Sequence, residues 1–571
     1  MKHLKIDIKK LELSGELILK DISFTLNRTD RVSIVGPNGA GKTTLLKVLT
    51  GEIGGYEGNI ENIGNLRIGY LQQIYQDNPE MTIEQELQNA FREINELNKK
   101  IDKVQKQMEQ DPSNMDFIET YSSLLEQLGH TGGHECHNKI HAVANGMGIV
   151  DLLSKKISEV SGGQRTKVAL AKVLLESPDI LFLDEPTNFI DMGSVEWLES
   201  YLNNKWSGGY VIISHDREFL DQVCHKTLEV QPQRPLEIYH TNYSDYVAER
   251  KLREKKKMDD YKREQEYIDK QENLINRFRA GSRAGWAKSR EKMLDKMDRI
   301  EAPYIPKKPK FFFGYTGESP EKVMSFKEVF IGRQEPLFYI GDLVLYKKQR
   351  IGVVGENGVG KSTFIKSIIG QLDVLDGFYS RGKAVQINYY SQMHEELDNT
   401  LTVRENFEKK GIHYPEQQLI GLLKHYLFDK NDIDKPVNLL SGGQRSKLLF
   451  ALLGQHDCNI LILDEPTNHL DYDTREELEQ ALQKFEGTIL FISHDRYFVN
   501  KLATNIWFIQ DGELSVSYGN YEDYTYKKQH NLDMDLSLFD EEAQINLVLE
   551  EKLGEREYKR LKDKFGKKKR R

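Results

Sequence analysis

Apolar and polar positions follow a recurring pattern along this chain. Short apolar runs such as Val32 to Val35 and Ile180 to Leu183 are followed at once by glycines or by carboxylates. Runs of this length, bounded by residues that break them, indicate buried strands. Helical stretches follow these strands, so the pattern predicts an α/β fold.

A first segment with helical spacing lies between residues 84 and 128. From Glu84 to Gln110 apolar residues recur at steps of three and four, which predicts a helix with a narrow apolar seam. Asp111-Pro112 then predicts the start of a partner helix. The seam residues are Leu87, Ala90, Ile94, Leu97, Ile101, Val104 and Met108, and those of the partner are Phe117, Tyr121, Leu124 and Leu128. This helix pair is either a binding arm or an insert that adds only stability.

A second segment with helical spacing runs from Arg250 to Lys310. Its apolar residues form one seam before the break at Ala280 to Gly285 and another after it, which predicts a helical hairpin. The first seam is Tyr261, Ile268 and Ile275, and the second is Trp286, Met293, Met297 and Ile300.

Charge sets this hairpin apart from the rest of the chain. Residues 250–310 hold 20 Lys and Arg against 11 Asp and Glu, although the whole chain has a net charge of −9. The hairpin tip, 277–290, contains no acidic residue and includes the rings of Phe278 and Trp286. Cations bind phosphates and rings stack on bases, so the tip is predicted to contact RNA; the alternative is a solvated charged spacer. The predicted RNA-binding residues are Arg277, Arg279, Arg283, Lys288 and Arg290.

A glycine-rich loop follows the strand that ends at Val35, and a helical run follows the loop. This order is typical of a phosphate-binding loop, in which backbone N–H groups face the phosphates and a lysine adds charge. A second loop of the same pattern begins at Gly355. The residues predicted to hold nucleotide phosphates are Gly36, Asn38, Gly39, Gly41, Lys42, Thr43 and Thr44 in the first loop, and Gly355, Asn357, Gly358, Gly360, Lys361, Ser362 and Thr363 in the second.

Carboxylates and histidines follow other strands in both halves. The sequence predicts that Asp184 and Asp464, with the hydroxyls of Thr43 and Ser362, bind Mg²⁺, and that Glu185 and Glu465 polarise the attacking water. His215 and His494 each follow a further apolar strand and are predicted to contact the γ-phosphate, although a lone histidine there is more often structural.

These motifs occur twice, which predicts two homologous domains. Lys361 lies 319 positions after Lys42, whereas Ser441 lies 280 positions after Ser161. The difference of 39 residues falls between Gln73 and Ser161 and contains the predicted helix pair. A feature present in one copy is expected to serve something other than the shared nucleotide chemistry.

Composition narrows the class of protein. A chain of 571 residues can form two or three domains. No apolar run approaches the roughly 18 residues of a membrane span, and the N-terminus has no signal-peptide core. The 3 cysteines lack metal-ligand spacing, which fits a reducing cytoplasm, so the predicted location is cytoplasmic.

The paired motifs resemble the ABC ATPase superfamily over residues 1–526. Two such domains without membrane spans, the basic linker and the sequence Glu-Pro-Thr-Asn-His-Leu-Asp at Glu465 to Asp471 resemble the ABC-F family of translation factors. The resemblance implies two P-loop ABC ATPase domains in tandem, joined by a long helical-hairpin linker. Its expected parts are domain 1 at 1–243 with an arm at 84–128, the linker at 244–318, domain 2 at 319–526 and a charged extension at 527–571.

The resemblance further implies ATP and Mg²⁺ as cofactors, and a monomer whose domains close head to tail on two nucleotides. Each phosphate loop would then face the other domain's Ser-Gly-Gly-Gln segment, and both sites are predicted to hydrolyse ATP. The implied additional contacts are Gln73 and Gln392 to the metal and nucleotide, and Ser161, Gly162, Gly163, Gln164, Ser441, Gly442, Gly443 and Gln444 to the nucleotide.

The family resemblance also implies the ribosome as partner. The linker tip looks like the tRNA-interaction motif of ABC-F proteins, which implies contact with rRNA and tRNA near the exit site and release on hydrolysis. The alternatives are the motor subunit of a membrane transporter, a DNA-repair ATPase, which the lack of zinc-binding cysteines disfavours, and an antibiotic-resistance member of the same family. The short tip favours a housekeeping factor.

Three departures from the family pattern stand out. Phe189 replaces the equivalent of His469, which predicts an asymmetric loop, and Val160 replaces the leucine seen at Leu440. Ser14 and Arg333 stand where an adenine-stacking aromatic residue is usual, so a strict preference for ATP over GTP stays open. The last ten residues hold seven basic side chains and one acidic one, which could bind rRNA or form a solubilising tail.

Overall fold

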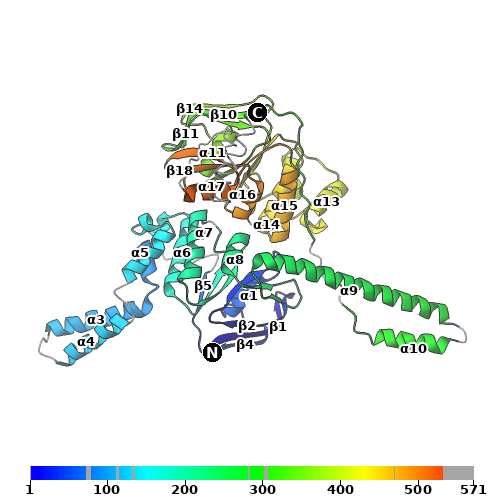
Figure 1. Ribbon diagram of the computed structural model, residues 1–571, viewed down its shortest axis with the longest axis horizontal. Helices are drawn as coiled ribbons and strands as arrows, with labels where there is room; N and C mark the ends of the chain where they lie inside the picture. Colours follow the sequence, from blue (N-terminus) through cyan, green and yellow to red (C-terminus); the bar gives the residue numbers. More distant parts are fainter. Residues whose placement is uncertain are drawn as a thin grey trace, which may run out of the picture. The chain divides into compact units, whose positions relative to one another are not determined.

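The computed structural model describes residues 2–71, 79–110, 115–130, 136–188, 190–280, 283–300, 302, 307–468 and 470–530. The chain forms two compact units, and the main division falls between Lys308 and Pro309. Both units combine helices with a sheet that contains parallel strands, so the predicted α/β class is confirmed (Figure 1). Within the described ranges, no helix combines the length and the apolar character needed to cross a bilayer.

The main sheet of the first unit has the strand order β5-β6-β7-β3-β8-β9. All neighbours are parallel except β8 and β9. Strands buried on both faces have to be apolar, which explains the runs seen in the sequence. The strands are β3 (Arg31–Val35), β5 (Ile68–Leu71), β6 (Ile180–Asp184), β7 (Gly209–Ile213), β8 (Lys226–Glu229) and β9 (Glu237–Tyr239).

A smaller antiparallel sheet and a set of helices complete this unit. The small sheet has the order β2-β1-β4 and is built from β1 (His3–Leu13), β2 (Glu16–Asn27) and β4 (Glu57–Ile63). The helices are α1 (Lys42–Leu49), α2 (Ile83–Gln88), α5 (Cys136–Gly146), α6 (Gly162–Glu176), α7 (Met192–Asn204) and α8 (Arg217–Val223).

The second unit repeats this plan in one mixed sheet. Its order is β12-β10-β11-β19-β18-β13-β17-β16-β15, with β14 paired to β10. The strands are β10 (Lys322–Gly332), β11 (Pro336–Ile340), β12 (Leu343–Tyr346), β13 (Arg350–Gly355), β14 (Asp376–Arg381), β15 (Ile387–Tyr390), β16 (Ile460–Asp464), β17 (Thr488–Ile492), β18 (Asn505–Gln510) and β19 (Glu513–Tyr518). The helices are α11 (Lys361–Ile369), α12 (Val403–Lys409), α13 (Glu416–His425), α14 (Gly442–Leu453), α15 (Tyr472–Lys484), α16 (Arg496–Leu502) and α17 (Tyr521–Gln529).

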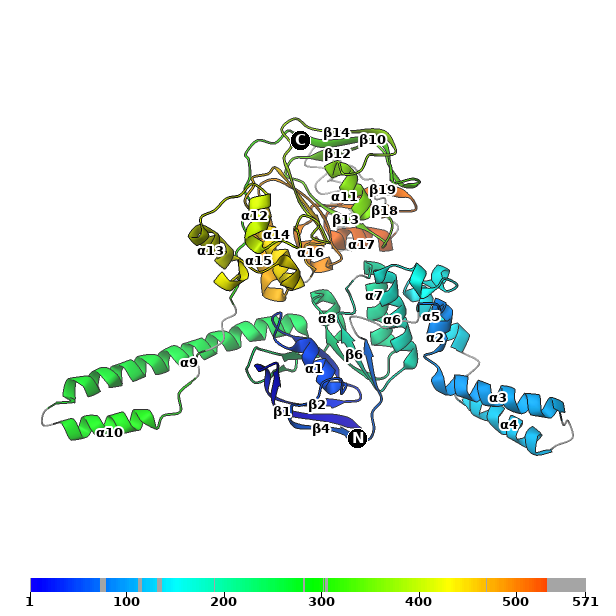
Figure 2. The ribbon, with the colours of Figure 1, turned by 180° about the vertical axis from the view of Figure 1, so that it is seen from behind.

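The arm of the first unit consists of α3 (Arg92–Gln110) and α4 (Met115–His130), which lie side by side (Figure 2). The prediction of one continuous helix over Glu84–Gln110 is wrong, because the chain breaks between α2 and α3. Leu87 is fully buried in the domain core, which holds α2 there, and a turn at Asn89 and Ala90 redirects the chain. The counterparts of α2 and α5 in the second unit, α12 and α13, are joined without such an arm.

The linker forms the predicted helical hairpin from α9 (Tyr243–Phe278) and α10 (Ala284–Asp295). Ile268 and Ile275 pack against Ala287 and Leu294, with Phe278 and Met297 beside them. The predicted second seam is therefore partly wrong. Its members Trp286, Met293 and Ile300 are 40%, 52% and 44% exposed. The buried residues of α10 stand one position later, because small Ala287 lets the two helices pack closely while the larger side chains turn outward.

Candidate functional site

The two phosphate loops have matching local geometry. Each leads from a buried strand, β3 or β13, into a helix that begins at the loop lysine. Lys42 Nζ donates to the backbone oxygens of Gly36 at 2.9 Å and Pro37 at 3.1 Å. Lys361 Nζ donates to Gly355 O at 2.7 Å and Glu356 O at 2.9 Å. The ammonium groups therefore lie over the loops, beside the helix N-termini that attract anions.

Burial lowers the pKa of both lysines, and neighbouring carboxylates oppose the shift. For Lys42 these carboxylates include Glu185 and Asp184, and for Lys361 they include Glu465 and Asp464. The loop lysine of each half thus lies near the acidic strand end that the sequence predicts for the same site.

Asp184 and Asp464 end the buried strands β6 and β16 and are 2% and 3% exposed. Burial raises the pKa of both carboxyls, that of Asp464 to about 6, and the hydroxyls of Thr43 and Ser362 oppose the rise. Both oxygens of Asp184 lack a donor at hydrogen-bonding geometry in the described part of the chain.

A buried carboxylate of this kind beside a hydroxyl fits Mg²⁺, which takes one or two protein oxygens and completes its shell with water and phosphate. Among the described residues no cluster of three or more His, Cys, Asp or Glu side chains forms a metal site.

The adjacent glutamates occupy an unusual backbone conformation. Glu185 and Glu465 both have φ of 52°, in the left-handed region that non-glycine residues rarely adopt. This turn aims each carboxylate at the next strand end. The backbone N–H groups of His215 and His494 donate to Oε2 of Glu185 and Glu465 at 3.2 Å in both halves. Nε2 of each histidine lies 3.4 Å from Oε1 of its glutamate.

Strand order explains why these groups meet. Within each sheet, the strands that end in the phosphate loop, the Asp-Glu pair and the histidine are neighbours and run parallel. Parallel strands bring their carboxyl ends to one edge, which is where ligands bind in such folds. The Glu465 carboxyl is 4% exposed, and burial raises its pKa.

The two Ser-Gly-Gly-Gln segments form helix caps. The hydroxyls of Ser161 and Ser441 accept from the backbone N–H of Gln164 and Gln444 at 3.3 Å. Oε1 of each glutamine in turn accepts from the backbone N–H of the serine. These capping boxes begin α6 and α14 at exposed positions. In the first unit, α6 packs on α2, α5 and β5, whereas α1 packs on β6. The segment is thus held on a different part of the domain from the phosphate loop.

Some predicted residues lie outside the described ranges, namely Gln73, Phe189, His469 and the extension beyond His530. Gln392 is described and half-buried after β15. One neighbour of the loops was missed from the sequence. A Cβ on Gly41 would lie 2.9 Å from the Ile18 side chain, and one on Gly360 would lie 3.0 Å from that of Leu337. The shared offset of 319 positions, known from the loop lysines, was the signal that could have revealed this pair.

The hairpin tip presents its cations in several environments. Arg283 lies over the Phe278 ring and Arg290 over the Trp286 ring, at 5.3 and 4.9 Å from the ring centres. Those two rings meet edge to face at 5.7 Å. Arg279 pairs with Glu291 at 3.6 Å, while the basic residues Arg277 and Lys288 are exposed. The tip is therefore a preformed cluster of rings and guanidinium groups.

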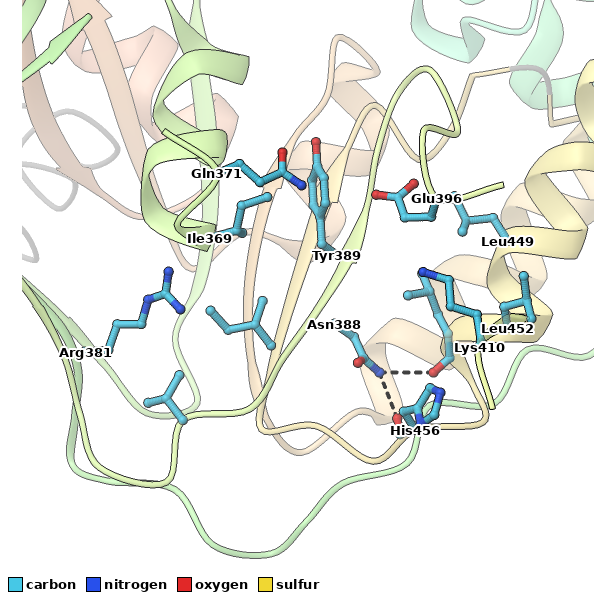
Figure 3. A pocket seen from close by; sticks show the side chains of 13 residues that line it. Ile369, Gln371, Arg381, Asn388, Tyr389, Glu396, Lys410, Leu449, Leu452 and His456 are labelled. Carbon is cyan, nitrogen blue, oxygen red and sulfur yellow. Dashed lines mark hydrogen bonds between the residues drawn. The ribbon is translucent and has the colours of Figure 1, made fainter. Parts of the chain in front are cut away.

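A hollow of about 450 Å³ lies beside edge strand β15 of the second unit (Figure 3). Apolar side chains of β15 and α14 line it, together with Arg381, Glu396 and Lys410, and the Asn388 side chain donates to Leu453 O and His456 O. None of the residues predicted to bind nucleotide lines it. A hollow of about 390 Å³ occupies the corresponding edge of the first unit, where the start of α3 contributes to the lining.

Comparison with protein families supports the duplicated architecture. A family model described as ABC transporter matches residues 19–188 and 341–468, and a second model with the same description matches residues 232–313. The predicted repeat of ATP-binding domains is thereby confirmed.

Several curated proteins are similar over nearly the whole chain. The putative ATP-binding protein YdiF of Bacillus subtilis is 35% identical, with 94% of this chain and 84% of that protein covered. ABC transporter F family member 5 of Arabidopsis thaliana is 33% identical, with 95% and 79% covered. The probable ATP-binding protein YbiT of Escherichia coli O157:H7 is 34% identical, with 91% and 98% covered.

Solved structures share the fold at lower identity. The archaeal ribosome recycling factor aABCE1, in complex with the ribosomal stalk protein aP1, has a TM-score of 0.58 at 17% identity, with 94% of this chain and 97% of that chain covered. The RNase-L Inhibitor has a TM-score of 0.55 at 18% identity, with 90% and 94% covered. These likenesses concern the tandem fold.

Proposed function

Because the chain belongs to the ABC-F family of tandem ABC ATPases, we propose that it binds the ribosome with ATP and leaves it after hydrolysis. The observation that carries this proposal is that each domain brings its loop lysine, Asp-Glu pair and histidine to one sheet edge, while the linker forms a basic, ring-bearing hairpin. An ATPase motor for a membrane transporter would not need the hairpin. Two structural neighbours, an archaeal ribosome recycling factor and an ABCE1 in a ribosome-bound archaeal complex, support this proposal.

In this proposal each ATP is held between a phosphate loop of one domain and the Ser-Gly-Gly-Gln segment of the other. One composite site uses Lys42, Thr43, Gln73, Asp184, Glu185 and His215 with Ser441 and Gly443. The other uses Lys361, Ser362, Gln392, Asp464, Glu465 and His494 with Ser161 and Gly163. Each Ser-Gly-Gly-Gln segment lies at an exposed helix N-terminus, whose backbone N–H groups attract anions, so it could bind a phosphate held by the other domain.

The chemistry follows from positioning and charge. Glu185 and Glu465 orient the attacking water and accept its proton, and His215 and His494 hold the glutamates and reach toward the γ-phosphate. Asp184 with Thr43, and Asp464 with Ser362, would hold Mg²⁺, which would neutralise charge on the phosphates. The loop lysines leave their backbone acceptors and bind phosphate oxygens.

The hairpin tip would supply the RNA contact. Its cations bind phosphates, which makes association sensitive to salt, and Phe278 or Trp286 can exchange its partner ring for an exposed base. ATP binding would hold the domains closed on the ribosome, and hydrolysis would release them.

A trapped variant tests the proposal. In Glu185→Gln plus Glu465→Gln, ATP binding persists while water activation is lost, so the protein should accumulate in ribosomal fractions when lysate is sedimented with ATP. The matched control, Lys42→Ala plus Lys361→Ala, should remain in the supernatant because it binds nucleotide poorly. Recovery of the trapped protein with membranes or chromatin would reject the proposal.

A second experiment addresses the tip. Replacing Arg277, Arg279, Arg283, Lys288 and Arg290 by glutamine in the trapped protein should lower ribosome association by at least about tenfold, because several phosphate contacts disappear. ATP turnover of the same replacements in the unmutated ATPase should be unchanged. Full ribosome association by this variant would show that the hairpin is only a spacer.

A further inference from the structure

Helix α9, the first helix of the hairpin, is anchored to the first domain at its N-terminal end by an ion pair between Arg250 and the buried Glu229. Arg250 Nε lies 3.0 Å from Glu229 Oε1 and 2.9 Å from Oε1 of Glu254, which is on the same helix as Arg250. Of the two carboxylates, Glu229 is the buried one, 1% exposed at the end of β8. The hydroxyl of Tyr239, on β9, donates to the same carboxylate at 3.3 Å. The pair therefore joins the last residue of a central strand to the first part of α9.

The same strand end touches the phosphate loop. The backbone N–H of Val230 donates to Val35 O at 2.8 Å, and a Cβ on Gly36 would lie 2.1 Å from Val230 O. Only glycine tolerates such a close approach. Glu229 is thus one residue away from a peptide that contacts the first glycine of the loop.

The second domain builds the same root without the buried carboxylate. Strand register pairs Val35 with Glu229 in the first sheet and Val354 with Phe508 in the second, so Phe508 stands at the position of Glu229. The two root helices, α9 and α17, begin with the matching sequences Asn-Tyr-Ser-Asp-Tyr and Asn-Tyr-Glu-Asp-Tyr.

An aromatic contact replaces the ion pair in this second root. The Phe508 ring packs on that of Tyr524 at 5.2 Å. Lys528 takes the place of Arg250, four residues after the second tyrosine of the motif, and lies over the same Tyr524 ring at 5.9 Å. The ion pair is therefore confined to the copy whose root helix continues into the hairpin.

Stability alone does not account for this difference. Burial raises the pKa of Glu229 even though Arg250 opposes the shift, so the ionised carboxylate loses hydration there. Buried ion pairs seldom stabilise a fold more than apolar residues of similar size. An ion pair with fixed geometry can instead hold the orientation of the α9 axis. That orientation matters because the 36 residues of α9 extend for about 54 Å. A tilt of about 10° at the root of a helix that long moves its far end by about 9 Å.

We propose that Glu229 and Arg250 are positioning residues that fix the direction of α9 relative to the first phosphate loop, and thereby aim the hairpin tip at RNA. The aiming role rests on the proposed function. The fixing of direction does not, and it can be measured without a ribosome.

The test introduces into the first domain the residue types found at the equivalent positions, Phe508 and Lys528, of the second. Glu229→Phe plus Arg250→Lys is made in a protein with Cys136→Ser, Lys9→Cys and Lys292→Cys, and spin labels on the two new cysteines report the distance between β1 and α10. The native cysteines Cys224 and Cys458 are buried. The expected result is a distance distribution at least twice as wide as in the parent, with ATP turnover within twofold of it. In the trapped background, ribosome association should fall at least tenfold.

Two further variants decide the outcome. Lys257→Ala, on α9, removes the more exposed ion pair that Lys257 forms with Glu237 of β9, and it should leave the distribution unchanged. Glu229→Gln keeps the shape of the side chain and should widen the distribution even if the double variant unfolds. An unchanged width in Glu229→Gln, or in a folded double variant, would overturn the proposal. A widened distribution with normal ribosome association would keep the positioning role and remove its link to RNA.

Discussion

The two nucleotide half-sites are nearly identical, whereas the elements attached to them differ. The bonds from His215 N to Glu185 and from His494 N to Glu465 have the same length, and both glutamates share the same φ. Within the residues that the structure describes, the arm is an addition to the first domain, and helix α9 of that domain extends into the hairpin. The features that both domains share are those proposed to serve nucleotide chemistry, and features present in one domain are where a specific role should be sought.

The corresponding hollows illustrate this difference. In the first domain, Ala90, Phe91 and Arg92 at the start of the arm help to line the hollow beside β5. In the second domain, Lys410 stands after α12 beside the hollow of Figure 3, and the chain continues to α13 without an arm. The arm is therefore an addition at a surface that both domains possess, and the sheet edge itself is unchanged.

The largest expected effect tests whether the half-sites are equivalent. Glu185→Gln and Glu465→Gln should each leave about half of the ATP turnover if the two sites act independently. The double substitution should lower turnover by about 100-fold or more, because water is no longer activated. Phosphate release measured on the three variants gives the answer. Unequal single variants would show that the sites differ despite their matching geometry.

A smaller expected effect is a difference in stability between the two domains when equivalent buried residues are replaced by alanine. Arg475 Nη1 lies 3.0 Å from Asp495 Oδ2 in the second domain, and both side chains are buried. The counterpart of Arg475 in the first domain is Val195, 280 positions earlier. Arg475→Ala should destabilise the second domain by about 3 kcal/mol, because the buried carboxylate of Asp495 loses the cation beside its Oδ2. Val195→Ala should cost the first domain about 2 kcal/mol through the cavity that it leaves.

Hydrogen-exchange mass spectrometry can follow these two losses, since it reports on peptides of each domain separately. Arg475→Met provides a control that removes the charge but keeps most of the volume. If Arg475→Ala lowered the free energy of unfolding by less than Val195→Ala does, the ion pair would not stabilise the second domain.

The smallest effect should be the same in both halves. Ser161→Ala and Ser441→Ala each remove one capping bond at 3.3 Å and should each destabilise the start of α6 or α14 by about 1 kcal/mol. Exchange protection of the two helix starts in nucleotide-free protein measures this loss. Ser161→Asp and Ser441→Asp should restore it, because aspartate caps helices as well as serine. A loss in one helix only would contradict the equivalence of the caps.

Much of the candidate site could be predicted because each motif is a contiguous piece of backbone. A strand, a glycine loop and a helix around Lys42 define their own geometry, and the repetition of the pattern around Lys361 made the domain count secure. The insertion was located by counting residues, and the structure narrows it to the segment between α2 and α5. The roles of individual residues stay predictions, and Gln73 lies outside the described residues.

The errors came from choices that local sequence leaves open. Apolar spacing continues from Leu87 to Ile101 as if in one helix, but Leu87 belongs to the domain core and Ile101 to the arm. In the hairpin, the sequence offers both Trp286 and Ala287 to the partner helix, and packing against Ile275 selects the smaller.

By itself, the sequence determined the two nucleotide-binding motif sets, their order and the charge of the linker, because these depend on residues that are neighbours along the chain. Only the tertiary structure decided which carboxylates are buried, that Glu229 meets Arg250 and which face of α10 is covered. Burial and pairing arise when segments far apart in sequence pack together and exclude water. They therefore cannot be read from any single stretch of the sequence.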